Sequence, residues 1–286
     1  MTRLQRSTHG SRLFRLATAV VIAALSLAGC GGGGGETGSP NASDSTLRVG
    51  SDLTYPPYTF LEDGQPAGFD PEFVDALGKE IDREPQIQDI RFEQLIASLK
   101  SDRIDLIASA LYITAERAKE VEYIPYFTTG NSIVVASEGE PLTGAQDLCG
   151  RSVAVIKGGD IVQRLREDAS AECEGAGEEP VDVLEFTTDP EATQALLSGQ
   201  VDAQVTDAAV AKEAVEKTSG QLTITSEELL YPIPVGLAVK KDNTELAAEV
   251  RTGLKEMRKS GEYAELLDRY NLGEPDQSRV DDILGS

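Results

Sequence analysis

Histidine is almost absent from this chain. The 286 residues include one, His9, and it lies within the first 29 residues. We expect that segment to be removed, for reasons given below, which leaves the rest of the chain without histidine. Ser-His-Asp and Cys-His catalysis is then excluded, and so are metal sites built on imidazole. The sequence indicates no metal site and no cofactor, and any catalysis would depend on carboxylates, Lys, Tyr or Ser alone.

Cysteine is also scarce, with three residues in the whole chain. Cys30 follows a charged and then an apolar stretch, and it comes directly after the N-terminal segment that we expect to be removed. Cys149 and Cys173 remain as an even pair in a protein expected outside the cytoplasm, where such a pair favours a disulfide. Two buried free thiols are the alternative, since no third type of ligand suggests a metal.

The apolar stretch near the N-terminus is too short to span a bilayer comfortably. It runs from Leu16 to Ala28, 13 residues, and four arginines precede it. Small residues and then Cys30 follow. This order resembles a bacterial lipoprotein signal over residues 1–29, in which Cys30 is acylated and becomes the mature N-terminus. A plain secretory peptide and a short membrane anchor are the alternatives.

Residues 30–46 are predicted to be a flexible tether, because five glycines are followed by small polar residues. Roughly 240 residues remain after signal and tether, which is enough for two lobes with separate cores. Loss of the four arginines of the signal changes the formal net charge from −23 to −27. Nucleic acid and anionic membrane surfaces would repel such a protein, so neither is an expected partner of its surface.

Short apolar stretches alternate with amphipathic ones along the rest of the chain. Asp70-Pro71-Glu72 favours a helix start, with Asp70 as the N-cap, Pro71 at the first position and Glu72 in the first turn, and Asp189-Pro190-Glu191 repeats this pattern. Strands alternating with helices predict an α/β fold with parallel sheets. The predicted strands cover 47–51, 104–108, 133–136, 152–156, 181–186, 201–205 and 235–239. The predicted helices begin near Asp70, Leu95, Thr114, Ile161, Asp189, Asp207, Leu246 and Tyr263.

Several segments, in this order, are together similar to one family. They are Asp52 to Tyr58 with Gly68 to Asp70, Ile104 to Ala108, Ile113 to Arg117, Val201 to Ala203 with Asp207, and Gly261 to Tyr263. From about Leu47 to Gly273 the chain resembles the family 3 extracellular solute-binding proteins, the amino-acid receptors of ABC importers.

The resemblance implies a two-lobed periplasmic-binding-protein fold of type II, which closes on its ligand like a flytrap. Lobe 1 would comprise residues 47–128 and 234–273, and lobe 2 residues 132–230. Two hinge strands would connect the lobes, and residues 274–286 would form a C-terminal tail.

The resemblance also implies a site for the two charges of an α-amino acid. Arg117 matches the arginine that binds the carboxylate, and a guanidinium suits that planar group. Asp207 matches the acid that binds the ammonium, and Ala110 stands where the family offers a backbone carbonyl to it. The alternatives are a surface arginine on a polar helix for Arg117 and a helix N-cap for Asp207.

Three further residues match positions of the family's side-chain pocket. The rings of Tyr55 and Phe92 would enclose the side chain of the ligand, and Asp52 would lie beside them. Ordinary core packing is the alternative for the two rings, and a turn or cap role is the alternative for Asp52.

The sequence departs from the family pattern at two positions. Tyr112 stands where Ser or Thr is usual, and its ring could make the pocket smaller. Gly159 and Asp160 lie in the loop where a small hydroxyl residue or glycine usually meets the carboxylate. An acid there would repel it, so we expect Asp160 to point away and to cap the helix from Ile161. Lys157 either restores positive charge at this loop or is simply solvated.

These observations predict a lipid-anchored, extracytoplasmic, monomeric receptor without catalytic activity. It would bind an amino acid and deliver it to an ABC permease in the membrane. If Asp52 and Asp160 both face the cleft, a basic ligand is favoured. A polar neutral one such as glutamine comes next, and a dicarboxylate lacks a second cation. The alternatives are an enzyme like the cyclohexadienyl dehydratases, with Asp160 or Tyr112 as the acid, and a ligand-sensing lipoprotein.

Overall fold

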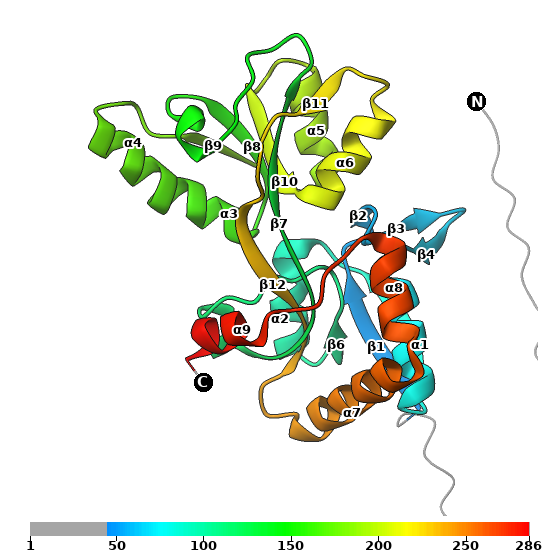
Figure 1. Cartoon of the computed structure of the whole chain (residues 1–286). Coiled ribbons are helices and arrows are strands. Elements are labelled where there is room, and N and C mark those ends of the chain that lie inside the picture. The colour runs from blue at the N-terminus through cyan, green and yellow to red at the C-terminus, as the bar shows by residue number, and fades with distance from the viewer. Residues whose placement is uncertain (1–44, 286) are drawn as a thin grey trace, which may run out of the picture. The chain divides into compact units, whose positions relative to one another are not determined.

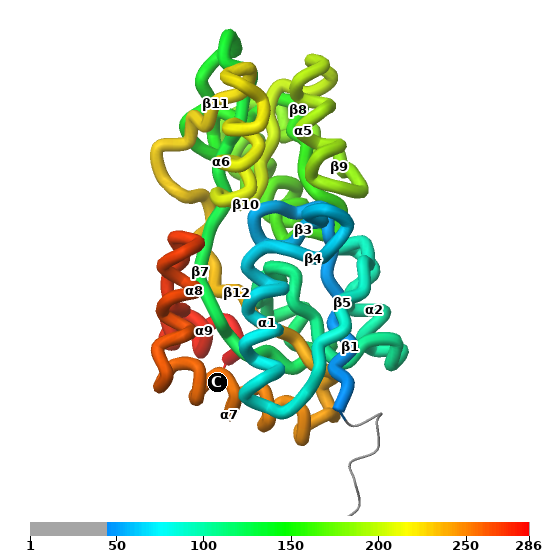
Figure 2. The backbone as a smooth tube through the Cα atoms, turned by 90° about the vertical axis from the view of Figure 1, so that its right-hand side faces the viewer, coloured from blue at the N-terminus to red at the C-terminus, as the bar shows by residue number. Residues whose placement is uncertain are grey.

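The computed structural model describes residues 45–285. The predicted signal 1–29 and Cys30 lie outside these residues, as does most of the predicted tether. The described residues form two lobes, which two long strands connect (Figure 1). These strands are β7 (Val121–Ala136) and β12 (Leu230–Lys240), and both pass from one lobe into the other (Figure 1 and Figure 2). The prediction of a two-lobed α/β fold is confirmed.

Lobe 1 brings the first strands of the fold together with its last helices, in the lower half of Figure 1. Its part of the main sheet contains β1 (Thr46–Ser51), β5 (Glu84–Asp89) and β6 (Leu106–Ile107), and a small second sheet contains β2 (Thr54–Tyr55), β3 (Thr59–Glu62) and β4 (Gln65–Ala67). Its helices are α1 (Phe69–Glu80), α2 (Leu95–Lys100), α7 (Thr244–Ser260), α8 (Glu262–Tyr270) and α9 (Gln277–Leu284).

Lobe 2 is built from the middle of the chain. Its strands are β8 (Ser152–Ile156), β9 (Asp182–Phe186), β10 (Ala203–Asp207) and β11 (Leu222–Ile224). Helix α3 (Asp160–Gln163) continues through a π-helical segment (Arg164–Ala169) into α4 (Ser170–Ala176), and α5 (Asp189–Leu197) and α6 (Ala208–Lys217) follow.

One main sheet runs through both lobes in the order β5-β1-β6-β12-β7-β10-β8-β9, and β11 also pairs with β7. The pairs β1–β5, β1–β6, β8–β9 and β8–β10 are parallel, as the alternation of strands and helices predicts. By contrast, β12 is antiparallel to β6 and to β7, and β7 is antiparallel to β10. The two connecting strands run in opposite directions because the chain leaves lobe 1 on one and returns on the other.

The core of lobe 1 is rich in aromatic side chains. Phe69 and Phe73 on one face of α1 meet Tyr126 and Phe127 of β7, with ring centroids 4.7 to 5.7 Å apart, and all four are fully buried. Burying one such ring stabilises the fold by about 1.5 to 3 kcal/mol relative to leaving it exposed. This cluster fixes α1 against the strand that leads into lobe 2.

Helix α1 begins differently from the prediction, in which Asp70 is the N-cap. The helix starts at Phe69, and no side-chain cap bond is present. The carbonyl groups of Pro57 and Tyr58 accept the N–H groups of Phe69 (3.2 Å) and Asp70 (2.8 Å), so no side chain is needed there. Gly68 permits this approach: its φ is +109°, and a Cβ would lie 2.5 Å from the oxygen of Pro57. The Asp70 carboxylate is thereby free for another role.

Helix α9 lies in the segment that the sequence analysis leaves as a tail. Val280 is 2% exposed and packs in the same cluster as Leu95 of α2 and Tyr123 of β7. The C-terminal segment therefore adds to the core of lobe 1. Within residues 45–285, no helix combines the length and the apolar character needed to cross a membrane.

The predicted disulfide between Cys149 and Cys173 is present in lobe 2. It joins the end of a 3-10 turn (Ala145–Leu148) to α4, and Cys173 is 1% exposed. The alternative of two free thiols is therefore wrong.

Removal of this disulfide is expected to destabilise the protein. The bond closes a loop between residues 24 apart in sequence, so its loss should lower the free energy of unfolding by about 3 kcal/mol. Urea denaturation of the double variant Cys149→Ser/Cys173→Ser, compared with the oxidised parent, measures this difference. Equal denaturation midpoints with equal slopes would contradict the expectation.

Candidate functional site

A small cavity of about 30 Å³ lies where the two lobes meet. It holds a few water molecules at most. Seven of the nine predicted ligand-binding residues line it, and Asp52 and Asp207 do not. The lining residues are Tyr55, Phe92, Ala110, Tyr112 and Arg117 from lobe 1, Asn131 from β7, and Ile156, Gly159, Asp160, Ile161, Val205 and Thr206 from lobe 2.

Arg117 reaches the cavity from lobe 1. The helix predicted from Thr114 is only a three-residue 3-10 turn, so its dipole adds little and the guanidinium itself is the charge at this wall. Its Nη1 donates to the carbonyl of Tyr112 (3.0 Å) and its Nη2 to the carbonyl of Gly158 in lobe 2 (2.8 Å). The guanidinium carbon lies 5.5 Å from the centroid of the Phe92 ring. Among residues 45–285, no carboxylate forms an ion pair with Arg117.

Asp207 ends β10 in lobe 2 and is fully buried. Its Oδ1 accepts the hydroxyl of Tyr58 (2.8 Å) and the N–H of Ala209 (3.0 Å), and its Oδ2 accepts the hydroxyl of Tyr112 (2.8 Å). Asp207 is therefore the N-cap of α6, the alternative considered for it. Burial raises the pKa of this carboxyl, and the hydroxyl donors partly oppose the rise. No cation pairs with it in the described part of the chain.

Tyr112 connects these two charged groups. Its hydroxyl binds Asp207, and its carbonyl accepts both Arg117 and the hydroxyl of Tyr123 (3.1 Å). Its backbone also forms a β-bridge with Val235 of β12. One residue of lobe 1 thus reaches from the guanidinium to the buried carboxylate, along the wall of the cavity.

The rings of Tyr55 and Phe92 both line the cavity. Tyr55 is 8% exposed, and its hydroxyl lies 3.3 Å from that of Thr206 in lobe 2. Thr206 in turn donates to Asp189 (2.7 Å), a second buried carboxyl whose pKa burial raises to about 6. Tyr55 therefore forms a further hydroxyl contact between the lobes.

Asp52 is placed behind the cavity wall and does not face it. Its carboxylate accepts the hydroxyl of Thr54 (2.7 Å) and the N–H of Phe92 (2.8 Å), and it forms an ion pair with Arg91 (2.8 Å). Asp52 thereby positions the backbone that carries the Phe92 ring, and Arg91 balances its charge.

Asp160 lines the cavity but is not the helix cap that the sequence analysis favours. Helix α3 starts at Asp160 itself, Gly159 precedes it, and no side chain caps it. The carboxylate instead pairs with Arg164 one turn later (3.2 Å), because the helical spacing of four brings the two side chains together. Lys157 pairs with Glu93 across the lobes (2.7 Å). The acids Asp52 and Asp160 thus each have a basic partner.

Ala110 has an unusual backbone, with φ at +45°, a region that side-chain-bearing residues rarely adopt. Its N–H donates to Oδ2 of Asp70 (3.0 Å), while the hydroxyl of Tyr126 donates to Oδ1 (2.5 Å). Asp70 is fully buried without a cation, and burial raises its pKa to about 7. This carboxyl holds the strained peptide at the cavity wall.

Sequence reasoning missed Tyr58, Asn131 and Thr206 as residues of this junction. Tyr58 stacks on Phe127 at 5.2 Å and is fully buried, so its pattern in the sequence is that of a core aromatic. Asn131 and Thr206 lie at neighbouring positions of the pairing of β7 with β10, where Asn131 is opposite Asp207 and Thr206 is opposite Ser132. Their place follows from strand pairing, which the sequence does not specify.

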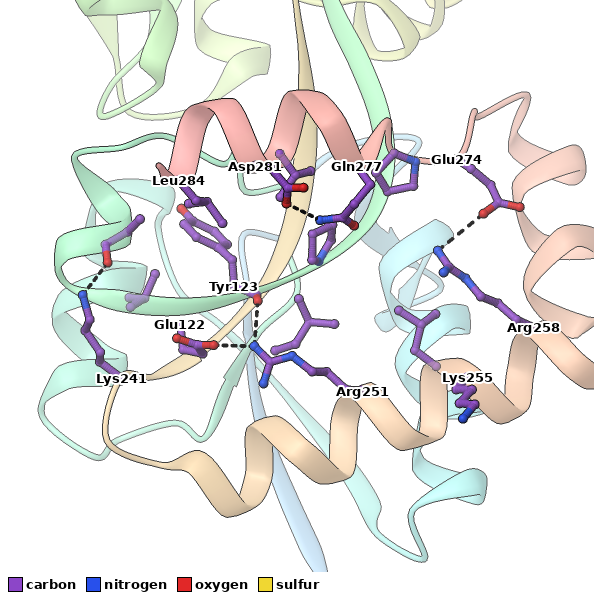
Figure 3. Close-up of a pocket in the computed structure, with 17 residues that line it drawn as sticks. Glu122, Tyr123, Lys241, Arg251, Lys255, Arg258, Glu274, Gln277, Asp281 and Leu284 are labelled. Atoms are coloured by element: carbon purple, nitrogen blue, oxygen red, sulfur yellow. Dashed lines mark hydrogen bonds and ion pairs between the residues drawn. The ribbon is translucent and has the colours of Figure 1, made fainter. Parts of the chain in front are cut away.

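Larger hollows are also present on the described surface, and two of them bear on the site. One, of about 1040 Å³, is lined by both lobes and adjoins the cavity, with which it shares Arg117, Gly159 and Asp160. The other, of about 770 Å³, lies between β7, α7 and α9 of lobe 1 (Figure 3). There Arg251 pairs with Glu122, and the groove shares no residue with the cavity.

The buried carboxyl of Asp70 is expected to make stability depend on pH. Folding raises its pKa from 3.8 to about 7, so the folded chain binds this proton more tightly. The free energy of unfolding should therefore fall as the pH rises from 4 to 7, by about 1.4 kcal/mol per unit from this group. Asp70→Asn keeps an acceptor for Ala110 and removes the titration. Urea denaturation at each pH checks this, and parallel curves for parent and variant would contradict it.

Comparison with known proteins agrees with this geometry. Residues 47–274 match the family described as bacterial extracellular solute-binding proteins, family 3. The L-cystine-binding protein TcyJ of Escherichia coli K12 is 32% identical over 228 residues, 79% of this chain and 82% of that protein. The L-arginine-binding protein of Pseudomonas aeruginosa is 31% identical over 240 residues, 80% of this chain and 89% of that protein.

A solved structure is also similar. An ancestral arginine-binding protein bound to glutamine is 34% identical, with a TM-score of 0.72, over 79% of this chain and 97% of that one. The family match covers well over half of the sequence, and two relatives exceed 30% identity over most of their length. The chain belongs to the bacterial extracellular solute-binding proteins of family 3.

Proposed function

We propose that this protein is an extracytoplasmic receptor that binds an amino acid between its lobes and delivers it to an ABC importer. One observation carries the proposal. A partly buried guanidinium, Arg117, lines the cavity from lobe 1, and a fully buried carboxylate, Asp207 of lobe 2, is hydrogen-bonded to Tyr112 of the cavity wall; neither has a partner of opposite charge within residues 45–285.

These two charged groups would be stabilised by a ligand that carries charges of opposite sign. A buried charge without a counter-ion costs several kcal/mol. A small zwitterion supplies a carboxylate to Arg117 and an ammonium to Asp207 and so offsets both costs at once. A neutral solute would satisfy neither group, and a dicarboxylate would leave one negative charge without a cation.

A basic or polar amino acid is the proposed ligand. The relatives are named for cystine and arginine, and the ancestral structure holds glutamine. The rings of Tyr55 and Phe92 provide flat apolar faces for the carbon chain of such a ligand, and Asp160 with its partner Arg164 lines the larger hollow that adjoins the cavity. The proposed site comprises Asp52, Tyr55, Phe92, Ala110, Tyr112, Arg117, Gly159, Asp160 and Asp207.

Binding must involve movement of the two lobes. A cavity of about 30 Å³ is smaller than any amino acid, so the lobes have to separate for the ligand to enter. We place the moving units at residues 47–128 with 234–273 and at 132–230, with the bends in β7 and β12 between them. The pairing of β12 with β7 is irregular between Leu230 and Ile233, which supports a bend there.

Delivery depends on a membrane partner. We propose that the ligand-bound form docks as a monomer on a permease, and that a lipid on Cys30 keeps it near the membrane. The named relatives are binding proteins, which favours binding without catalysis. A role in sensing would use the same site.

Replacement of Arg117 by alanine is expected to abolish amino-acid binding and leave the fold intact. Its guanidinium has no carboxylate partner to lose, so the melting temperature without ligand should change little. A thermal-shift screen with the twenty common L-amino acids and L-cystine identifies the ligand, and calorimetry then measures its affinity. Arg251→Ala, on the same lobe but away from the cavity, is the matched control. An unchanged affinity in Arg117→Ala would refute the assignment.

Replacement of Cys30 by alanine is expected to release the protein from the membrane. A single acylated cysteine is the proposed anchor, and the described residues contain no helix fit to span a bilayer. Cell fractionation with detection in membrane and soluble fractions measures the change. Retention of the variant in the membrane fraction would show that the N-terminal segment has another role.

A further inference from the structure

One ion pair connects the two lobes beside the cavity. The Nζ of Lys157 lies 2.7 Å from Oε2 of Glu93. Lys157 follows β8 in lobe 2, and Glu93 belongs to a 3-10 turn of lobe 1 (Phe92–Gln94). The other ion pairs between described residues each connect groups of the same lobe. Within residues 45–285, opposite charges therefore link the lobes at this one place.

The backbone on each side of this ion pair is held within its own lobe. Phe92 and Ile156, the neighbours of the two partners in sequence, both line the cavity. The N–H of Phe92 donates to the carboxylate of Asp52 (2.8 Å), and the N–H of Lys157 donates to the carbonyl of Phe186 in β9 (2.8 Å). Because each backbone is fixed in its own lobe, separation of the lobes must pull the two charges apart.

The loop that follows Lys157 lies directly against the turn that carries Glu93. A Cβ on Gly158, whose φ is +78°, would lie 3.1 Å from the Cα of Glu93. The carbonyl of Gly158 also accepts Nη2 of Arg117 from lobe 1 (2.8 Å). The ion pair is therefore part of a contact between the lobes that exists only while they are closed.

We propose that Glu93 and Lys157 form an ionic latch, which closes when the lobes close and slows the release of the ligand. The inference rests on the proposed function and adds a conformational device to it. The ionic strength outside the cell would then set how long the lobes hold an amino acid, whichever amino acid that is.

The effect of the latch on release follows from the size of the cavity and the exposure of the pair. A ligand leaves only after the lobes separate, because the closed cavity of about 30 Å³ has no room for its passage. Separation breaks the ion pair, so the pair slows this step. The side chains of Lys157 and Glu93 are 51% and 27% exposed, so dissolved salt reaches and screens them. A pair of this kind changes a rate by roughly two- to fivefold.

The experiment reverses each charge of the latch in turn. The release of L-arginine and of L-glutamine is followed by stopped flow in the purified parent, Glu93→Lys, Lys157→Glu and the double variant. In about 0.01 M salt, each single variant should release ligand roughly three- to fivefold faster than the parent, because like charges then face each other. The double variant restores opposite charges, and its rate should return to within about twofold of the parent. In about 1 M salt, where the Debye length is about 3 Å, all differences should fall below about twofold.

The two single variants change the charge beside the cavity in opposite directions. A long-range effect on the ligand would therefore move their release rates in opposite directions, whereas loss of the latch moves both upward. Lys100→Glu is the matched control, because it reverses one charge of a pair within lobe 1, Lys100–Glu120, and Lys100 lines the same larger hollow as Glu93. Its release rate should stay within about 1.5-fold of the parent.

The outcomes separate the latch from the proposed function. Unchanged rates in both single variants, changes in opposite directions, or no recovery in the double variant would overturn the latch, while binding by the parent leaves the proposed function standing. If the parent binds neither amino acid and the full thermal-shift screen is also negative, both proposals fail.

Discussion

The carboxylate of Asp207 is the group to which most of the site geometry is tied. It terminates β10, caps α6 and accepts phenol hydroxyls from two residues of the other lobe. Because it is fully buried, each of its oxygens needs a donor: Oδ1 has the N–H of Ala209 in lobe 2 and the hydroxyl of Tyr58, and Oδ2 accepts the hydroxyl of Tyr112 from lobe 1. The requirement to satisfy one buried charge therefore brings the lobes together at this point. Tyr112 then extends from that contact to Arg117.

Three buried carboxyl groups in this fold accept hydrogen bonds from neutral donor groups. Asp70, Asp189 and Asp207 are each at most 3% exposed, and hydroxyl, amide and N–H groups bind them. Within residues 45–285 no basic side chain forms an ion pair with these three carboxyls, whereas Asp52 pairs with Arg91. Burial raises the pKa of all four acids. The interior near the junction is thus rich in acceptors and poor in cations, which suits a ligand that brings its own positive charge.

The sequence predicted the larger features because they depend on local patterns. The alternation of strands and helices predicted the α/β class, and β8 covers residues 152–156, as the sequence indicated. The disulfide followed from cysteine count and compartment. The resemblance supplied the two lobes, and seven of its nine site residues line one cavity. These features can be predicted without knowing which side chains, distant in the sequence, are in contact.

The remaining details depended on contacts between distant segments. Asp70 is not a cap because the carbonyls of residues 57 and 58 already take the helix N–H groups. Asp160 is not a cap because Arg164 lies one turn away and binds it. Tyr58 looked like a core residue and is one, yet its hydroxyl also reaches Asp207. Such double roles cannot be assigned until the tertiary packing is known.

In the proposed binding event, contacts of the ligand replace hydrogen bonds that the protein already makes between its own lobes. A ligand shifts the balance between open and closed lobes only by what it contributes beyond the contacts that the protein makes alone. Here hydroxyls of Tyr55, Tyr58 and Tyr112 already connect the lobes. Neutral hydrogen bonds of this kind contribute about 1 kcal/mol each, and those to a charged group about 1.5 to 3 kcal/mol. The affinity is then set by how far the ammonium and carboxylate of the ligand exceed this internal contribution.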